Sequence, residues 1–149
     1  MAVLTPHTPE EFFAGHEDGL AVYRSVTAAV AALGDYEERV SRSQIALRHG
    51  RSFAFVWRPG QYLRSEVPAV LSIALRRRVE SPRIKEVVRP APRVWMHHLE
   101  MRSPGEVDDQ VAQWLAEAYL DQAPDPEQQR DQAGQAEGQE PGPTDRGES

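Results

Sequence analysis

The chain contains two stretches in which apolar residues recur every three or four positions, which is the spacing of an amphipathic helix. One helix is predicted from about Glu17 to Leu33, and another ends at about Leu120. The apolar stripe of the first is Leu20, Tyr23, Val26, Val30 and Leu33. The stripe of the second is Val107, Val111, Trp114, Leu115 and Ala118. Each stripe predicts a face that packs against the rest of the chain.

Helix-start and helix-end signals mark the boundaries of these segments. Thr8-Pro9-Glu10-Glu11 has the capping-box pattern with proline at the first helical position, and it predicts a short helix through Phe12 and Phe13 that ends near Gly15. Ser103-Pro104-Gly105-Glu106 has the same pattern and predicts the start of the last helix. Gly34 stands where a left-handed residue would end the long N-terminal helix.

Between the helices, apolar and polar residues alternate, which predicts β-strands. About five strands are expected, at residues 42–48, 52–58, 68–75, 84–89 and 94–102. His49-Gly50 indicates a tight turn, and Pro90-Ala91-Pro92 indicates a stiff one. Consecutive strands with short turns favour an antiparallel sheet. The predicted class is therefore α+β, with two N-terminal helices and one C-terminal helix packed on one face of the sheet.

The alternation assigns the strand residues to two faces, because successive side chains of a strand point to opposite sides. The helix-covered face is predicted to be Ile45, Leu47, Phe53, Phe55, Trp57, Leu71, Ile73, Leu75, Trp95, Leu99 and Met101. The open face is predicted to be Arg42, Gln44, Ala46, Arg48, Ser52, Ala54, Val56, Ser72, Ala74, Arg76, Lys85, Arg89, His98 and Glu100. A register slip of one residue would exchange the faces of the strand concerned.

The charges are distributed unevenly along the chain. The segment from Arg39 to Arg93 has 13 basic and three acidic residues, a net charge of +10. The flanking segments 1–38 and 94–122 carry net charges of −6 and −5. The basic segment is also the one with strand patterning, so the sequence indicates an arginine-rich sheet for anions or acidic partners.

The open face offers a candidate binding site with a floor of small residues and a basic rim. Arginine presents a planar donor fork to carboxylate or phosphate, and glutamine offers both a donor and an acceptor. Arg42 and Arg48 would supply charge, Gln44 orientation, and His98 a contact that responds to pH. The complete candidate set is Arg42, Ser43, Gln44, Arg48, Arg76, Lys85 and His98.

Three interpretations of this face follow. The leading hypothesis is a non-enzymatic binding module that takes an anionic ligand, a nucleic-acid backbone or an acidic protein segment. The alternative is a homodimerisation domain with the open face as its interface, where Ala46, Ala54 and Ala74 would permit close approach. The simplest interpretation is an ordinary solvated sheet face, because charged residues mostly decorate solvated surfaces.

The segment His97-His98-x-Glu100 is the strongest candidate for a reactive cluster. Adjacent histidines on a strand point to opposite faces, so they cannot bind one ion together, whereas His98 and Glu100 share a face. A zinc site would need a third ligand, such as His49 or Gln44. A metal-assisted hydrolase is therefore a minor alternative, and the sequence assigns no metal, cofactor or catalytic residue. No glycine-rich phosphate loop or nucleophile elbow is present.

Length and composition set the remaining limits. A chain of 149 residues predicts one domain over residues 1–122. Residues 123–149 contain no large apolar residue, carry a net charge of −5, and are predicted to be disordered. The absence of cysteine excludes disulfides, thiolate zinc sites and a cysteine nucleophile. No signal peptide or membrane span is visible, so a cytoplasmic protein is expected.

Several separated segments resemble a bacterial domain-of-unknown-function family, number 5655. They are Thr8-Pro9-Glu10-Glu11-Phe12-Phe13, Arg42-Ser43-Gln44-Ile45-Ala46-Leu47-Arg48, Phe53-Ala54-Phe55-Val56-Trp57, Lys85-Glu86-Val87, Met96-His97-His98-Leu99-Glu100 and Trp114-Leu115-Ala116-Glu117-Ala118-Tyr119. The resemblance extends from about Leu4 to Leu120, and Arg42 stands where the family suggests lysine. It implies a small α+β bacterial domain and brings no activity, cofactor or catalytic residue with it.

Overall fold

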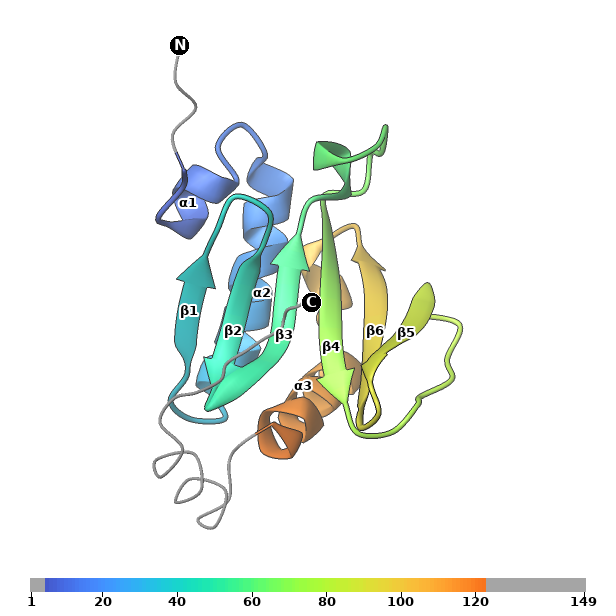
Figure 1. Cartoon of the computed structure of the whole chain (residues 1–149). Coiled ribbons are helices and arrows are strands. Elements are labelled where there is room, and N and C mark those ends of the chain that lie inside the picture. The colour runs from blue at the N-terminus through green and yellow to red at the C-terminus, as the bar shows by residue number, and fades with distance from the viewer. Residues whose placement is uncertain (1–4, 123–149) are drawn as a thin grey trace.

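A six-stranded antiparallel sheet with helices on one face forms the described part of the protein, residues 5–122 of a computed structural model (Figure 1). The strands lie in the order β1-β2-β3-β4-β6-β5. Their bounds are β1 Glu37–Val40, β2 Ile45–His49, β3 Arg51–Trp57, β4 Ala69–Leu75, β5 Glu86–Ala91 and β6 Val94–Met101. The α+β class is confirmed. The predicted 123–149 tail lies outside the described residues.

Three helices accompany the sheet. They are α1 Pro9–Phe12, α2 Glu17–Ala31 and α3 Asp109–Asp121, and two short 3₁₀ turns lie at Pro59–Gln61 and Pro104–Glu106. Helices α2 and α3 contact each other and cover the same face of the sheet, as predicted (Figure 1). None of the helices in residues 5–122 is long and apolar enough to cross a lipid bilayer.

The N-terminal helices begin where the sequence predicts. The Thr8 hydroxyl accepts a hydrogen bond from the backbone N–H of Glu11, and the Glu11 carboxylate accepts one from the N–H of His7. Helix α2 ends at Ala31, two residues before the predicted end at Leu33, and Gly34 follows with a φ of +148°, which favours glycine. The Tyr119 hydroxyl would also lie only 2.7 Å from a Cβ at this position.

The predicted start of the last helix is wrong. Ser103 makes no side-chain capping bond, and Pro104–Glu106 forms only one 3₁₀ turn. The true N-cap is Asp108, whose carboxylate accepts the backbone N–H of Val111. Glu106, which the capping box would turn towards its own helix, accepts the N–H of Arg102. The helix therefore starts at Asp109, five residues later than the sequence pattern indicates.

Strand β1 is the strand that the sequence analysis missed. Its sequence, EERV, is exposed for three of its four residues, so it has no alternation of apolar and polar positions. It is held by pairing with β2 and by the hydroxyl of Tyr23 on α2, which donates a hydrogen bond to Glu38. At the other edge, β5 extends through Pro90 to Ala91, so the predicted turn lies two residues later, between Ala91 and Val94.

The core lies between the sheet and the helices. All seven residues of the central strand β4 are buried, including the small side chains Val70, Ser72 and Ala74 on the face that no helix covers. The large side chains that are almost completely buried include Phe13, Ile45, Leu47, Phe53, Leu71, Ile73, Leu75, Leu99, Met101 and Leu115. Gly19 allows α2 to approach this core closely, since a Cβ there would lie 2.7 Å from the Phe13 ring and 2.9 Å from the carbonyl of Pro68.

A β-bulge in β3 determines which side chains reach each face. Leu47 is opposite Ala54, whereas the next residue of β2, Arg48, is opposite Ser52. Phe53 is therefore an extra residue on β3, and both it and Ala54 are fully buried. An inserted residue of this kind reverses the alternation of side chains along the strand.

The bulge corrects four face assignments. Ala54 and Val56 are opposite Leu47 and Ile45 and face the helices, although they were predicted on the open face. Phe55 and Trp57 were predicted in the core but lie on the open face. The predicted floor therefore keeps the small residues Ala46, Ser72 and Ala74 and gains the rings of Phe55 and Trp57.

Candidate functional site

The face of the sheet that no helix covers, here called the open face, is the candidate functional site. One row of directly opposed residues crosses all six strands, and directly opposed residues share a face. The row is Arg39, Ala46, Phe55, Ser72, His98 and Glu86, in the order β1, β2, β3, β4, β6, β5. A neighbouring row contains Trp57, Val70 and Glu100. The open face therefore combines an aromatic centre with charged edges.

A hydrogen-bonded chain of three side chains organises the centre of this face. The indole Nε1 of Trp57 donates to the Ser72 hydroxyl oxygen at 2.9 Å, and that oxygen lies 2.6 Å from Nδ1 of His98. The Trp57 and His98 rings also meet edge to face, with centroids 6.1 Å apart. Because Ser72 accepts from Trp57, its own proton can be donated to Nδ1 of a neutral His98, leaving the histidine proton on Nε2.

The surroundings of His98 favour this neutral form. Burial lowers the pKa of His98, and the nearby Glu86 carboxylate opposes the shift only in part. A serine this close to a histidine also has the geometry of an activated nucleophile. However, Ser72 is only 2% exposed and its oxygen already accepts from Trp57. The geometry therefore suits holding Trp57 in place better than attacking a substrate.

Three predicted site residues, Arg42, Ser43 and Gln44, form the turn between β1 and β2 instead of strand positions. The loop after β3 is bound to this turn: Gln61 donates to the carbonyl of Arg42 at 2.9 Å, and the Tyr62 hydroxyl donates to that of Ser43 at 3.4 Å. The Tyr62 ring packs against Trp57, with centroids 6.2 Å apart. The turn and the His98 cluster are thus connected through Trp57 and Tyr62.

Arg48 and Arg76 lie at the opposite end of the sheet from this turn. Arg48 is near the end of β2, and Arg76 follows the end of β4, which runs in the same direction. Nε of Arg48 is buried and has no hydrogen-bond partner within residues 5–122, and Nη2 reaches only the carbonyl of Gly50, at 3.4 Å. Arg42 and Arg48, predicted to act together, are therefore separated by the length of β2, about 13 Å or more.

The placement of Lys85 and Arg89 on the open face is wrong. Glu86 is opposite His98 on the open face, so the neighbouring Lys85 points to the other side. The guanidinium of Arg89 lies over the ring of Trp95, 4.8 Å from its centroid. Trp95 is opposite Leu75 on the helix-covered face. The bulge between Val88 and Ala91 and the prolines of this strand obscure its alternation in sequence.

His97 faces the core, as the alternation predicts, and it is 1% exposed. Its Nε2 accepts the backbone N–H of Val79 at 2.9 Å, and Nδ1 lies 3.3 Å from the carbonyl of Ile73. Burial lowers the pKa of His97, so this histidine is a neutral structural link between β6 and the loop after β4. In the described part of the chain, no three His, Cys, Asp or Glu side chains are placed so that they could hold a metal ion together.

Some arginines of the basic segment 39–93 form ion pairs within the molecule. Arg77 makes two hydrogen bonds to Glu117 of α3, at 2.7 and 2.9 Å, and Arg83 makes two to Asp108, at 2.8 and 2.9 Å. These arginines hold the pKa of both carboxyls below the usual range. The loop between β4 and β5 is thereby attached to the acidic C-terminal helix.

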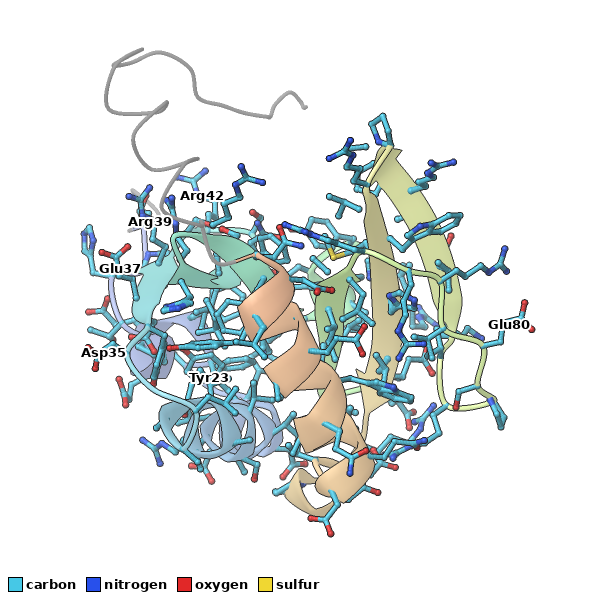
Figure 2. All side chains as sticks on the ribbon, turned by 90° about the horizontal axis from the view of Figure 1, so that it is seen from below. Tyr23, Asp35, Glu37, Arg39, Arg42 and Glu80 are labelled. Carbon is cyan, nitrogen blue, oxygen red and sulfur yellow. The ribbon has the colours of Figure 1, made fainter. Side chains whose placement is uncertain are left out.

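The charges that remain on the open face are divided between its two halves. Arg39 and Arg42 lie on the side of β1 and β2 that faces away from α2, whereas Tyr23 lies between the sheet and that helix (Figure 2). With Arg48, these arginines make the β1–β2 half basic, offset in part by Glu37. The β5–β6 half is acidic, with Glu86 exposed and Glu100 half-buried beside Arg102 at 3.4 Å.

A cleft of about 590 Å³ lies away from the open face, between the start of α2 and the loop before β4. His16, Arg58 and Glu66 contribute to its wall. Burial and the neighbouring Arg58 lower the pKa of His16. The start of α2 has no side-chain cap, but Glu17 and Asp18 in its first turn oppose an anion there. The cleft combines charges of both signs, and the sequence analysis did not identify it.

Sequence reasoning missed Phe55 and Trp57 as residues of the open face, and it placed Ser72 there without including it in the candidate set. Period-two alternation from Phe53 assigned both aromatic residues to the core, and no local signal reveals the inserted residue. The tryptophan itself was the available signal, since a buried indole N–H needs a hydrogen-bond acceptor. Ser72 supplies that acceptor from the neighbouring strand.

Comparison with known proteins gives one match. The family described as "Domain of unknown function (DUF5655)" matches residues 10–122. No curated protein and no solved structure matches the chain.

Proposed function

The chain belongs to the DUF5655 family, and we propose that it is a non-enzymatic binding module whose open face is the binding surface. Its ligand would be an anionic molecule, a nucleic-acid backbone or an acidic protein segment. The observation that carries the proposal is the position of Arg39, Arg42 and Arg48. They are not among the arginines that form ion pairs within residues 5–122, and they flank an aromatic centre held by hydrogen bonds.

The arrangement supports binding for a physical reason. Arginine forks recognise carboxylate and phosphate groups, and neighbouring aromatic rings offer apolar contact area with few rotatable bonds. The Trp57–Ser72–His98 chain and the contact with Tyr62 hold the aromatic centre in one conformation. A prepared surface loses less conformational entropy when it binds a ligand.

Binding of the full chain to heparin, and to labelled single- and double-stranded nucleic acid, should be measured across a salt series. We expect binding that weakens steeply as salt increases, since released counterions drive such association. Arg42→Ala together with Arg48→Ala should weaken binding roughly tenfold while the fold is retained, because two charge contacts are lost.

Arg51→Ala is the matched control. It removes one positive charge, where the double variant removes two, and Arg51 is exposed opposite His49, which stacks on Tyr119 of α3 on the helix side. A double variant that binds as tightly as the wild type, or an Arg51→Ala variant that is weakened equally, would exclude the open face as the anion-binding surface.

The alternative predicted from the sequence is a structural homodimerisation domain with this face as its interface. The acidic protein segment would then belong to a second copy of the chain.

A further inference from the structure

The open face has opposite charges at the two ends of a single row of residues. Arg39 on β1 begins the row and Glu86 on β5 ends it, and both side chains are exposed. Neither makes a side-chain hydrogen bond or ion pair within residues 5–122. A partner that satisfies both ends needs an acidic group opposite β1 and a basic group opposite β5, and this chain itself presents that pattern.

We propose that the partner of the open face is a second copy of the chain, bound face to face about a two-fold axis that runs parallel to the strands between β3 and β4. The inference rests on the proposed function and names its partner. Rotation about this axis reverses the order of the strands, so β1 of one copy faces β5 of the other. Arg39 then meets the Glu86 side chain of the second copy, and the same contact occurs twice.

The sizes of the side chains fit this arrangement as well. In the shared row, Phe55 faces Ser72 of the second copy, and Ala46 faces His98. In the next row, Trp57 faces Val70. Large side chains of one copy are thus placed over smaller ones of the other, which is how two sheets interdigitate when they pack about 10 Å apart.

The charge pattern also distinguishes between the two face-to-face arrangements in which the strands of the two copies are aligned. A two-fold axis perpendicular to the strands would place β1 on β1 and β5 on β5. Arg39 would then meet Arg39, and Glu86 would meet Glu86, so both ends would repel. Only the axis parallel to the strands brings opposite charges together at both ends of the row.

The area of the face suits a dimer of moderate stability. Six strands spaced about 4.8 Å apart and about six residues long cover roughly 500 Å² of each copy. The total of roughly 1,000 Å² lies at the lower limit for specific interfaces. We therefore expect a dimer that dissociates on dilution, with its aromatic centre buried.

A charge-swap experiment tests the arrangement. The mass of the full chain should be measured by sedimentation equilibrium over a concentration series for wild type, Arg39→Glu, Glu86→Arg and the double variant. Each single variant should dimerise roughly tenfold or more weakly, because each dimer then contains two repulsive contacts. The double variant, and an equimolar mixture of the two single variants, should dimerise nearly as well as wild type, because opposite charges face each other again.

Arg78→Glu is the control. It makes the same charge change at an exposed position in the loop between β4 and β5, off the open face, and it should dimerise like wild type. The inference is overturned if the wild-type chain stays monomeric up to about 1 mM. A dissociation constant of that size corresponds to an association free energy of only about 4 kcal/mol. A dimer that tolerates both single variants, or one that the double variant does not restore, also overturns it.

Different results would contradict the proposed binding function and the proposed dimer. A monomeric wild type that still binds heparin through Arg42 and Arg48 would leave the proposed function intact and make the partner a different acidic molecule. A dimer that follows the charge-swap pattern without binding heparin would restrict the function of this face to self-association.

Discussion

Ser72 is the residue on which the order of the open face depends most directly. It is almost fully buried, and its single oxygen serves the indole of Trp57 and the imidazole of His98 at once. Alanine would leave both ring nitrogens without this partner. A buried polar group that loses its partner costs more free energy than an average hydrogen bond contributes.

Ser72→Ala is therefore expected to lower the free energy of unfolding by about 1–3 kcal/mol. Urea unfolding monitored by circular dichroism would measure the change. Ser52→Ala is the matched control, since Ser52 lies on the same face and makes no side-chain hydrogen bond within the described chain. Equal losses for the two variants would contradict the role assigned to Ser72.

At the scale of the elements, the cap of α3 shows how tertiary contacts choose between two local signals. Ser103 and Asp108 both have the residue type of an N-cap. The carboxylate of Asp108 also receives two hydrogen bonds from Arg83, which comes from the loop before β5. Arg83 is distant in sequence and contacts Asp108 but not Ser103. This contact favours Asp108 as the N-cap, so the helix begins there.

Asp108→Ala should lower the unfolding temperature, because a cap to Val111 is lost together with the Arg83 contact. Ser103→Ala should change stability by less than about 0.5 kcal/mol, as expected of a surface position without a special contact. Asp108→Asn should fall between the two, since asparagine keeps the cap without the charge. Thermal unfolding would measure all three, and a larger loss for Ser103→Ala would restore the capping box as the helix start.

At the scale of the whole molecule, ion pairs join the basic segment 39–93 to the acidic C-terminal helix α3 and its N-cap. Arg77 and Arg83 attach the loop after β4 to α3, and His97 binds Val79 of the same loop from the core side. This loop is therefore fixed by two ion pairs and by a histidine that must stay neutral. The contacts that fix this loop should therefore weaken at low pH, where His97 and the two carboxylates become protonated.

We expect the free energy of unfolding to fall as the pH drops from about 7 to 5. Burial lowers the pKa values of His16, His97 and His98 in the folded protein, so the unfolded chain binds more protons below about pH 6.5. The stabilising effect is fully present above that pH and is lost as the pH falls towards the folded values. Glu117 and Asp108, whose pKa values are also lowered, add a second loss below about pH 4.5.

Urea unfolding at several pH values would measure this dependence, with histidine NMR titration to identify the groups. Stability that is constant or rises between pH 7 and 5 would contradict it. A His97 resonance that titrates at or above its unfolded value would remove this residue from the explanation.

The sequence by itself determined the α+β class, the positions of most helices and strands, and the capping of the first helix. Periods of 3.6 and 2, capping residues and glycine turns act over a few neighbouring residues, so they can be recognised without knowing the fold. The opposite orientations of His97 and His98 follow from the same local geometry.

Only the tertiary structure decided which residues share the open face. The extra residue Phe53 reverses the faces of β3, and the apolar pattern cannot reveal it because Phe53 is as apolar as its neighbours. Strand β1 has no alternation of its own and forms by pairing with β2. The Trp57, Ser72 and His98 cluster comes from three strands that meet only in the folded sheet. Its members are far apart in sequence, so their contact depends on strand order and register, which local patterns do not specify.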